Sequence, residues 1–191
     1  DNLVNAIFKC AYKLFELEFS ALDVPLYHED CRAWTVSRKG VDIAVFIGDY
    51  FARPSKRSGA WCSAMRSQAK FPKKQIPIVI NVCNFSKLEN TVLSFDDAKT
   101  LFHEFGHALH QILSDVTYDI ISGTSVARDF VELPSQLFEH WLEVPEILEE
   151  FATHCDTGEP LASDVLSAIL KASKSLSGGL SDNINHLAVS A

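Results

Sequence analysis

Hydrophobic side chains recur every three or four residues through the first stretch of the chain. This spacing predicts an amphipathic helix over Asp1–Leu22, because residues three and four apart share one helix face. The same periodicity follows Ser94, where Asp97 completes a capping-box pattern, and it predicts a long helix from Phe95 to about Leu113. Three further helices are expected in the C-terminal half: Val126–Leu142 despite Pro134, Pro145 to about His154, and Leu161 to about Leu176.

Four segments ahead of the long helix have the residue pattern of β-strands. They are Arg32–Val36, Val41–Phe51, Ala60–Arg66 and Ile76–Phe85. Gly40 favours a hairpin turn between the first two, because glycine tolerates the positive φ of a tight turn. Pro77 has no amide hydrogen to donate, so it confines the start of the last strand to a sheet edge or a bulge. The chain is therefore predicted to be α+β, mainly α with a small antiparallel β-sheet.

Two of these segments are candidates for contact with a substrate. An edge strand at Ile76–Phe85 could pair with an extended peptide, although most such strands simply complete a sheet. The basic segment Ala52–Gly59 fits either a solvated turn or a substrate contact. The sequence leaves both pairs of alternatives open.

The composition is that of one folded domain, with 191 residues, 47% hydrophobic and 22% charged. A net charge of -8 argues against nucleic acid as a partner. No apolar run is long enough to cross a membrane, and the five scattered cysteines form no C-x-x-C pair, which favours a reducing, cytoplasmic setting. The chain has no initial Met and starts inside a helical pattern, so we expect a piece of a longer protein.

The long predicted helix contains His-Glu-x-x-His. His103 and His107 are four residues apart, so their imidazoles project from one helix face, as two ligands of one zinc ion require. Glu104 lies about 100° around the helix, where it can take a proton from a water as general base. Gly106 costs about 1 kcal/mol relative to Ala in a helix, which indicates that another backbone approaches there. The pattern predicts one Zn²⁺ per chain, and the alternative is a buried helix with incidental histidines.

A catalytic zinc site requires a third protein ligand. The remaining donors near the motif are His110, Asp115, Asp119, Asp129 and Glu132. Glu132 is favoured, because a carboxylate among Phe130, Val131 and Leu133 must be paired, hydrogen-bonded or coordinated. Asp129, one turn earlier, is the candidate to accept a hydrogen bond from a ligand histidine. His110 projects from another face of the helix and fits an ordinary core or surface histidine.

Four separated segments carry a shared pattern: L-F-H-E-F-G-H-A-L-H, S-G-T-S-V-A-R-D-F-V-E-L-P-S-Q-L-F-E-H-W, Y-F-A-R-P-S-K-R-S-G-A-W and N-V-C-N-F-S-K. They begin at Leu101, Ser122, Tyr50 and Asn81. Together they resemble the thimet-oligopeptidase family of zinc metallopeptidases, and most of all its bacterial peptidyl-dipeptidase (dipeptidyl carboxypeptidase) branch. The resemblance extends over roughly residues 12 to 175.

The resemblance implies that His103, His107 and Glu132 bind zinc and that Glu104 is the general base. It implies a zincin-like catalytic core, with the metal site on two adjacent helices, in a mostly helical fold split by a deep channel. The edge strand, near Ile78–Asn84, would run antiparallel to a short peptide substrate. Residues 1–191 would then be a single partial metallopeptidase catalytic domain, whose partner is the rest of the parent domain.

Two departures from the family pattern keep two functions open. Family members are several times longer, and they carry a downstream Gly-rich loop with a His and several Tyr that contact substrate, whereas no Tyr follows Tyr118 in this chain. The first hypothesis is a zinc-dependent peptidase of the oligopeptidase or peptidyl-dipeptidase type. The second is a fragment that binds zinc but is catalytically incompetent.

Overall fold

The computed structural model describes residues 2–87, 92–153, 157–162, 164–168, 171 and 189–190. Its helices are α1 (Asn2–Phe15), α2 (Phe95–Ile112), α3 (Leu133–Glu139) and α4 (Pro145–Phe151), with the 3₁₀ turns η1 (Asp119–Ile121) and η2 (His140–Glu143). Its strands are β1 (Leu17–Ala21), β2 (Arg32–Arg38), β3 (Val41–Phe51), β4 (Trp61–Arg66), β5 (Ile78–Phe85), β6 (Val92–Leu93) and β7 (Val189–Ser190). The predicted hairpin turn at Gly40 is confirmed by the antiparallel pairing of β2 with β3.

Five strands form one sheet in the order β1-β2-β3-β5-β4. Strands β1, β2 and β3 pair antiparallel, β3 and β5 pair parallel, and β4 is antiparallel to β5. The α+β class is confirmed, but the prediction of an antiparallel sheet is wrong because the sheet is mixed. The parallel pair arises because the chain leaves β3, forms β4 one place further out, and then returns as β5 between them.

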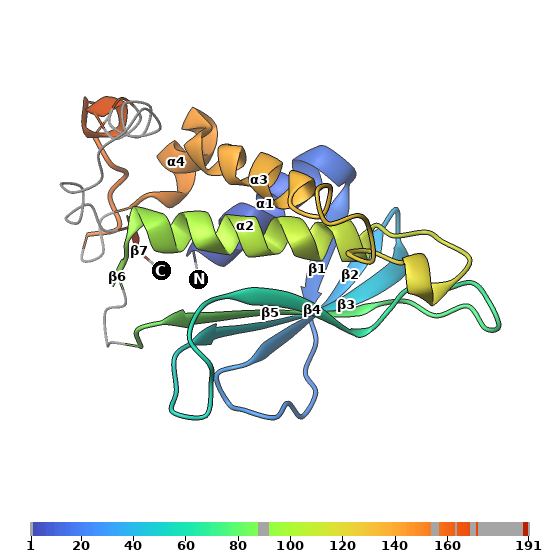
Figure 1. The fold of residues 1–191 in the computed structure, drawn as a ribbon. Coiled ribbons are helices and arrows are strands. Elements are labelled where there is room, and N and C mark those ends of the chain that lie inside the picture. The colour runs from blue at the N-terminus through green and yellow to red at the C-terminus, as the bar shows by residue number, and fades with distance from the viewer. Residues whose placement is uncertain are drawn as a thin grey trace.

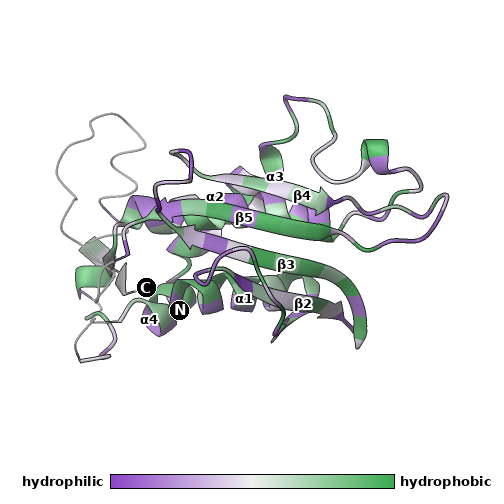
Figure 2. Cartoon of the chain, turned by 90° about the horizontal axis from the view of Figure 1, so that it is seen from below, coloured by the Kyte–Doolittle hydropathy of each residue, from purple (hydrophilic) through white to green (hydrophobic). Residues whose placement is uncertain are grey.

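Strand β5 lies inside the sheet, so the expectation that Ile76–Phe85 forms the edge is also wrong. Pro77 precedes the first paired residue, and its carbonyl accepts a hydrogen bond from the Val45 amide at 3.0 Å. The missing amide hydrogen of proline therefore removes no bond from the ladder. Figure 2 shows the central strands β3 and β5 as hydrophobic over most of their length, as burial on both faces requires.

The first predicted helix is shorter than expected. Helix α1 ends at Phe15, Glu16 takes a positive φ of 57°, and Leu17–Ala21 pairs with β2 instead of continuing the helix. Leu17 is 1% exposed and Glu18 is exposed, which is the alternation of a strand. The apolar residues here fit both a helical and a strand period, and the pairing with β2 decides between them.

Helix α2 is the central element of the fold. Its predicted capping box is confirmed, because Ser94 Oγ accepts from the Asp97 amide and the Asp97 carboxylate accepts from the Ser94 amide, both at 3.1 Å. Figure 1 shows α2 lying along one face of the sheet, with α3 and α4 on its other side. Phe46, Phe102 and Phe105 are fully buried between these layers. None of the helices in the described ranges is long and apolar enough to cross a membrane.

The helix predicted over Val126–Leu142 is helical only in its second half. Residues 126–132 are not helical, and α3 begins at Leu133 with Pro134 in its first turn. The first turn of a helix tolerates proline, because an amide hydrogen there has no partner within the helix. Helix α4 is also shorter than predicted, ending at Phe151, and residues 164–168 are helical within the last predicted helix. His154 and the end of that last helix lie outside the described residues.

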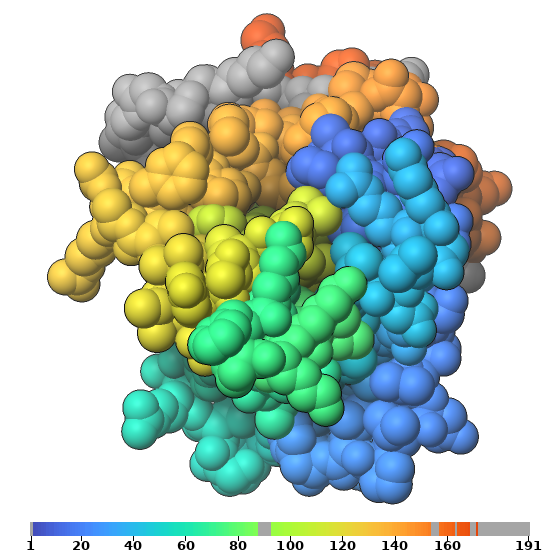
Figure 3. All heavy atoms as spheres, turned by 90° about the vertical axis from the view of Figure 1, so that its right-hand side faces the viewer, coloured from blue at the N-terminus to red at the C-terminus, as the bar shows by residue number. Residues whose placement is uncertain are grey.

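The segment that follows α2 rests against the long β4–β5 connection. The amides of Lys70 and Phe71 both donate to the Thr117 carbonyl, and the rings of Phe71 and Tyr118 meet at 5.9 Å. Figure 3 shows the tip of this connection lying beside the segment in yellow that follows α2. These contacts fix the path of the chain as it leaves α2 and turns back towards α3.

Gly106 is the point of closest approach between α2 and α3, as the sequence predicted. A Cβ at this position would lie 2.5 Å from Ser135 Cα and 2.8 Å from the Pro134 carbonyl oxygen. Backbone atoms cannot yield as a flexible side chain can, so any larger residue must push the two helices apart. The start of α3 is therefore held against α2 by the absence of a side chain.

We predict that Gly106→Ala destabilises the fold by about 1–3 kcal/mol, the cost of overpacking a close-packed core. Helix propensity alone predicts the opposite sign, a gain of about 1 kcal/mol. Urea unfolding followed by circular dichroism measures the difference. A variant as stable as the original chain, or more stable, would show that the two backbones are not in tight contact.

Candidate metal centre

His103 and His107 lie side by side on one face of α2. Their ring centroids are 4.9 Å apart, and the side chains are 26% and 13% exposed. This arrangement follows from the four-residue spacing on a regular helix. Burial lowers the pKa of His107, and its Nδ1 is buried without a hydrogen-bond partner among the described residues. A lowered pKa keeps the imidazole neutral, which is the form that binds a metal.

Glu132, the residue that precedes α3, lies close to both histidines. Its Oε2 lies 3.2 Å from His103 Nε2 and 3.2 Å from His107 Nε2. Ser135 Oγ donates to the Glu132 carboxylate at 3.0 Å and also lies 2.8 Å from its carbonyl oxygen. Glu132 is the N-cap residue of α3 and does not lie within a helix. The site was expected on two adjacent helices, and this expectation is corrected: the histidines lie on α2 and the carboxylate lies just before α3.

The charge state of Glu132 also suits a ligand. Burial opposes its ionisation, but the hydrogen bond from Ser135 and the nearby His107 and His103 together hold its pKa below the ordinary value. A lowered pKa favours the ionised carboxylate, which is the form that binds a metal.

Glu139 accepts a hydrogen bond from Nδ1 of His103, the ring nitrogen that does not face Glu132. His103 Nδ1 lies 2.5 Å from Glu139 Oε1, and Lys99 Nζ lies 3.3 Å from Glu139 Oε2. The role predicted for Asp129 is therefore filled by Glu139, while Asp129 lies on an exposed turn. A carboxylate on Nδ1 fixes the ring so that Nε2 points towards Glu132. The sequence analysis missed Glu139. The available signal was its spacing of seven residues from Glu132, which is about two helical turns.

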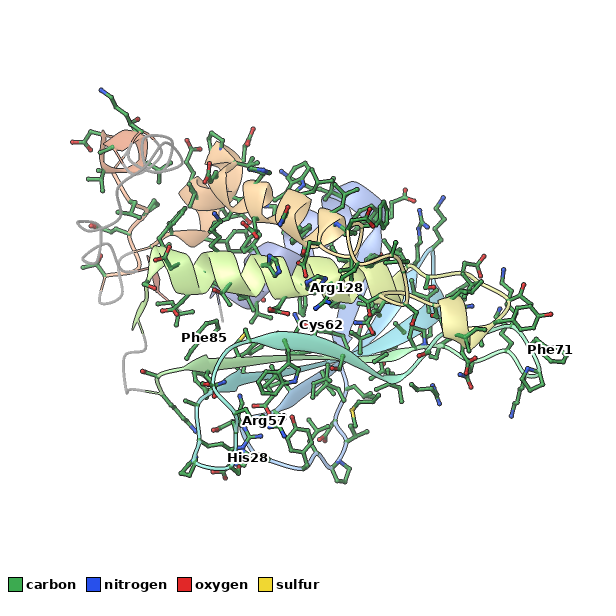
Figure 4. All side chains as sticks on the ribbon, viewed as in Figure 1. His28, Arg57, Cys62, Phe71, Phe85 and Arg128 are labelled. Atoms are coloured by element: carbon green, nitrogen blue, oxygen red, sulfur yellow. The ribbon has the colours of Figure 1, made fainter. Side chains whose placement is uncertain are left out.

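Glu104 is buried between α2 and the sheet, close enough to His103 for that residue to influence its pKa. It is 7% exposed, and burial raises its pKa, partly opposed by His103. Gln111, two turns further along α2, donates from Nε2 to Cys62 Sγ on β4 at 3.1 Å. Figure 4 shows Cys62 between α2 and the sheet. Glu104 is near Cys62 of β4 as well as His103 of α2, and it has the raised pKa expected of a group that takes up a proton.

The other candidate ligands lie apart from this cluster. Among the described residues, the acid and histidine donors that come together are His103, His107 and Glu132. Asp115 pairs with Lys70 at 2.9 Å, and Asp119 begins an exposed 3₁₀ turn. The ring of His110 packs near Phe130, with the centroids 6.2 Å apart. The structure thus brings together the three residues that the sequence favoured and separates the alternatives.

The three donors fit a zinc ion in chemistry and in spacing. Two imidazole nitrogens and one carboxylate oxygen lie within 4.8 Å of one another. In a tetrahedral zinc site with bonds of about 2.0–2.1 Å, neighbouring ligand atoms are about 3.3–3.4 Å apart. Two of the three separations are 3.2 Å, close to that value. The three side chains are therefore arranged as three ligands of one metal ion would be.

Strand β4 ends the sheet on one side and lies against α2, where Cys62 meets Gln111. A cavity of about 290 Å³ separates β4 from residues 122–125 and from Gln111 at the end of α2. Its lining is polar, with Ser63 and Ser122 among the residues that face it. A chain in extended conformation laid along β4 would lie beside α2, the helix that carries both histidines. The edge expected at β5 is therefore provided by β4.

Comparison with known proteins identifies relatives along almost the whole chain. The family model described as Peptidase family M3 matches residues 1–187. The chain is 42% identical over 176 residues to a dipeptidyl carboxypeptidase of Salmonella typhimurium and 40% identical to that of Escherichia coli. It is 34% identical over 180 residues to oligopeptidase A of Escherichia coli. Each match covers 90% of this chain but only 26% of the relative, so the chain spans about a quarter of their length. The chain belongs to Peptidase family M3.

Proposed function

We propose that this chain carries the zinc-binding core of a metallopeptidase that hydrolyses short peptides. The observation that carries the proposal is the single Glu132 oxygen placed 3.2 Å from the Nε2 atoms of both motif histidines. Zinc when bound would act as a Lewis acid on the scissile carbonyl and acidify a water for attack. His103, His107 and Glu132 would hold it in a zincin-like arrangement, and Glu139 would orient His103.

Glu104 would act on the substrate side of the site. Its carboxylate, with a pKa raised by burial, would take the proton from the attacking water and deliver it to the leaving amine. The neighbouring β4 edge would align the peptide by backbone hydrogen bonds, because an edge strand presents unpaired amide and carbonyl groups. The names of the relatives, dipeptidyl carboxypeptidase and oligopeptidase A, support peptides as the substrate class.

A second candidate is a zinc-binding chain with little activity of its own. It is favoured because the chain spans about a quarter of its relatives, which leaves room for further substrate-binding residues in the parent protein. We propose that residues 1–191 are a part of one catalytic domain and that the rest of that domain is its partner. The free thiols of Cys10, Cys31, Cys62 and Cys83 support a cytoplasmic location for this protein.

We predict that Glu132→Ala lowers zinc affinity by more than the roughly 10- to 100-fold that loss of an outer hydrogen-bond partner costs. Asp129→Ala is the matched control, since it removes a carboxylate three residues earlier from an exposed turn. Competition with a chromogenic chelator measures both affinities. Equal zinc affinity for the two variants would remove Glu132 from the ligand set.

Replacing Glu139 by Gln keeps the shape of the side chain but removes the charge that accepts from His103. We expect zinc affinity to fall about 10- to 100-fold, because the ring loses its orienting partner. Glu146→Gln, on the exposed side of α4, is the control and should leave affinity unchanged. The same chelator competition applies, and an unchanged affinity in Glu139→Gln would contradict the orienting role.

Glu104→Gln should leave zinc stoichiometry intact and lower peptide hydrolysis about 10²- to 10⁴-fold, since only the proton carrier is lost. Emission spectroscopy of the dialysed protein gives the zinc content, and a quenched fluorescent peptide gives the rate. Zinc binding without measurable turnover in the unaltered chain would favour the second candidate. Undiminished hydrolysis by the variant would show that another group carries the proton.

A further inference from the structure

The connection between β3 and β4 has to cross the end of β5, because β5 lies between these two strands in the sheet. Residues 52–60 make this crossing. Figure 4 shows Arg57, from this connection, on the side of the sheet that faces away from α2. The path of this connection decides where the edge strand β4 begins.

One lysine holds the connection to β3, the strand that it leaves, and to β5, the strand that it crosses. The side chain of Lys56 is only 4% exposed. Its ammonium donates to the Asp49 carbonyl at 3.0 Å, the Phe51 carbonyl at 2.8 Å, the Asp49 carboxylate at 3.1 Å, and the Cys83 carbonyl. We call these four oxygens the Lys56 cage. Two carbonyls come from the end of β3 and one from β5, so a single charged group ties the crossing segment to both.

The charge in the cage is balanced by a buried carboxylate. Asp49 is 1% exposed, and Arg53 binds both of its oxygens at 2.7 Å. Tyr27 donates to the same carboxylate at 2.6 Å. Burial raises the pKa of Asp49, but the hydrogen bonds from Arg53, Tyr27 and Lys56 outweigh it and hold that pKa far below the ordinary value. The carboxylate is therefore ionised, and removal of Lys56 leaves three buried carbonyls without their donor.

The same connection is attached to β5 a second time just before β4 begins. Asn84 Nδ2 donates to the Arg57 and Gly59 carbonyls, each at 2.7 Å. The first residues of β4 then pair with β5, with Trp61 opposite Val82. The next residue of β4 is Cys62, which meets α2 through Gln111. The cage thus lies at one end of the edge strand, and the metal-site helix lies beside it.

We propose that Lys56 is a positioning residue for peptide binding: its ammonium braces β3 and β5 and so holds the edge strand β4 where a peptide can pair with it beside the metal centre. This inference rests on the proposed function, because it takes β4 as the peptide-binding edge. A purely structural lysine would affect the whole fold equally. A positioning lysine affects the β4 edge and leaves His103 and His107 on α2, and Glu132 before α3, in place.

Two compounds that bind zinc distinguish a positioning role of Lys56 from a purely structural one. Acetohydroxamate contacts only the metal, whereas a tripeptide hydroxamate also contacts the edge strand. For zinc-loaded Lys56→Ala, we expect affinity for the tripeptide hydroxamate to fall about tenfold or more, since small misplacement of a binding surface has large effects. Affinity for acetohydroxamate should stay within about twofold, as only the metal site is probed. Lys74→Ala, at an exposed lysine of the β4–β5 connection, should change neither. Calorimetry gives all the affinities.

A chemical rescue tests the cage itself. Four oxygens, one of them charged, form a site for a free ammonium ion once the lysine side chain is removed. Ammonium chloride should therefore restore tripeptide hydroxamate binding in Lys56→Ala, while tetramethylammonium chloride at the same ionic strength should not. A loss of affinity that ammonium cannot restore would overturn the role given to the cage.

Hydrogen exchange provides a measurement that does not depend on zinc. Lys56→Ala should speed amide exchange in β4 and leave the middle of α2 protected, because the local opening is confined to the edge. Asn84→Ala should give the same pattern more weakly and serves if Lys56→Ala does not fold. Uniformly faster exchange, or an equal loss of affinity for the two hydroxamates, would show that Lys56 only stabilises the fold and would overturn the proposal. Failure of the unaltered chain to bind zinc would instead refute the proposed function, while exchange still reports on β4.

Discussion

The site depends on the contact between the middle of α2 and the start of α3. Gly106 lets Pro134 and Ser135 approach the helix backbone, and Ser135 is fully buried there. The residue just before α3, Glu132, is thereby brought to the face of α2 that carries the histidines. The same packing places Glu139, one turn after Ser135 on α3, within hydrogen-bond distance of His103 Nδ1. One close backbone contact thus brings both Glu132 and Glu139 to His103.

Two carboxylates near the histidines, Glu104 and Glu132, have pKa values displaced in opposite directions. Glu104 is buried against the sheet, and desolvation raises its pKa. Glu132 is half exposed and receives a hydrogen bond from Ser135 as well as the field of two imidazoles, so its pKa is lowered. Environments that separate the pKa values of neighbouring carboxylates also separate their chemical roles. A carboxylate that stays ionised suits coordination, and one that can hold a proton suits general base catalysis.

The mixed sheet connects this centre to a second ionic cluster on its opposite side. Parallel pairing of β3 with β5 forces the chain to cross β5 before it forms β4. The crossing is secured by Lys56 and Asp49, both almost fully buried, and by Asn84. Buried ions are costly to desolvate, and they persist only when several partners surround them. In this chain those partners are the backbone carbonyls at the ends of β3 and β5 and the guanidinium of Arg53.

Local patterns by themselves determined the helix that carries His103, Glu104 and His107, its capping box and the hairpin at Gly40, because each depends on neighbours only a few residues apart. The choice of Glu132 came from its apolar neighbours and from the family resemblance. Only the tertiary structure decided that Leu17–Ala21 is a strand, since its apolar residues fit both periods until β2 pairs with it. It also decided that β4 is the edge, that Pro134 opens a helix and that Glu139 binds His103. These features depend on contacts between residues far apart in the chain, whose geometry no local spacing specifies.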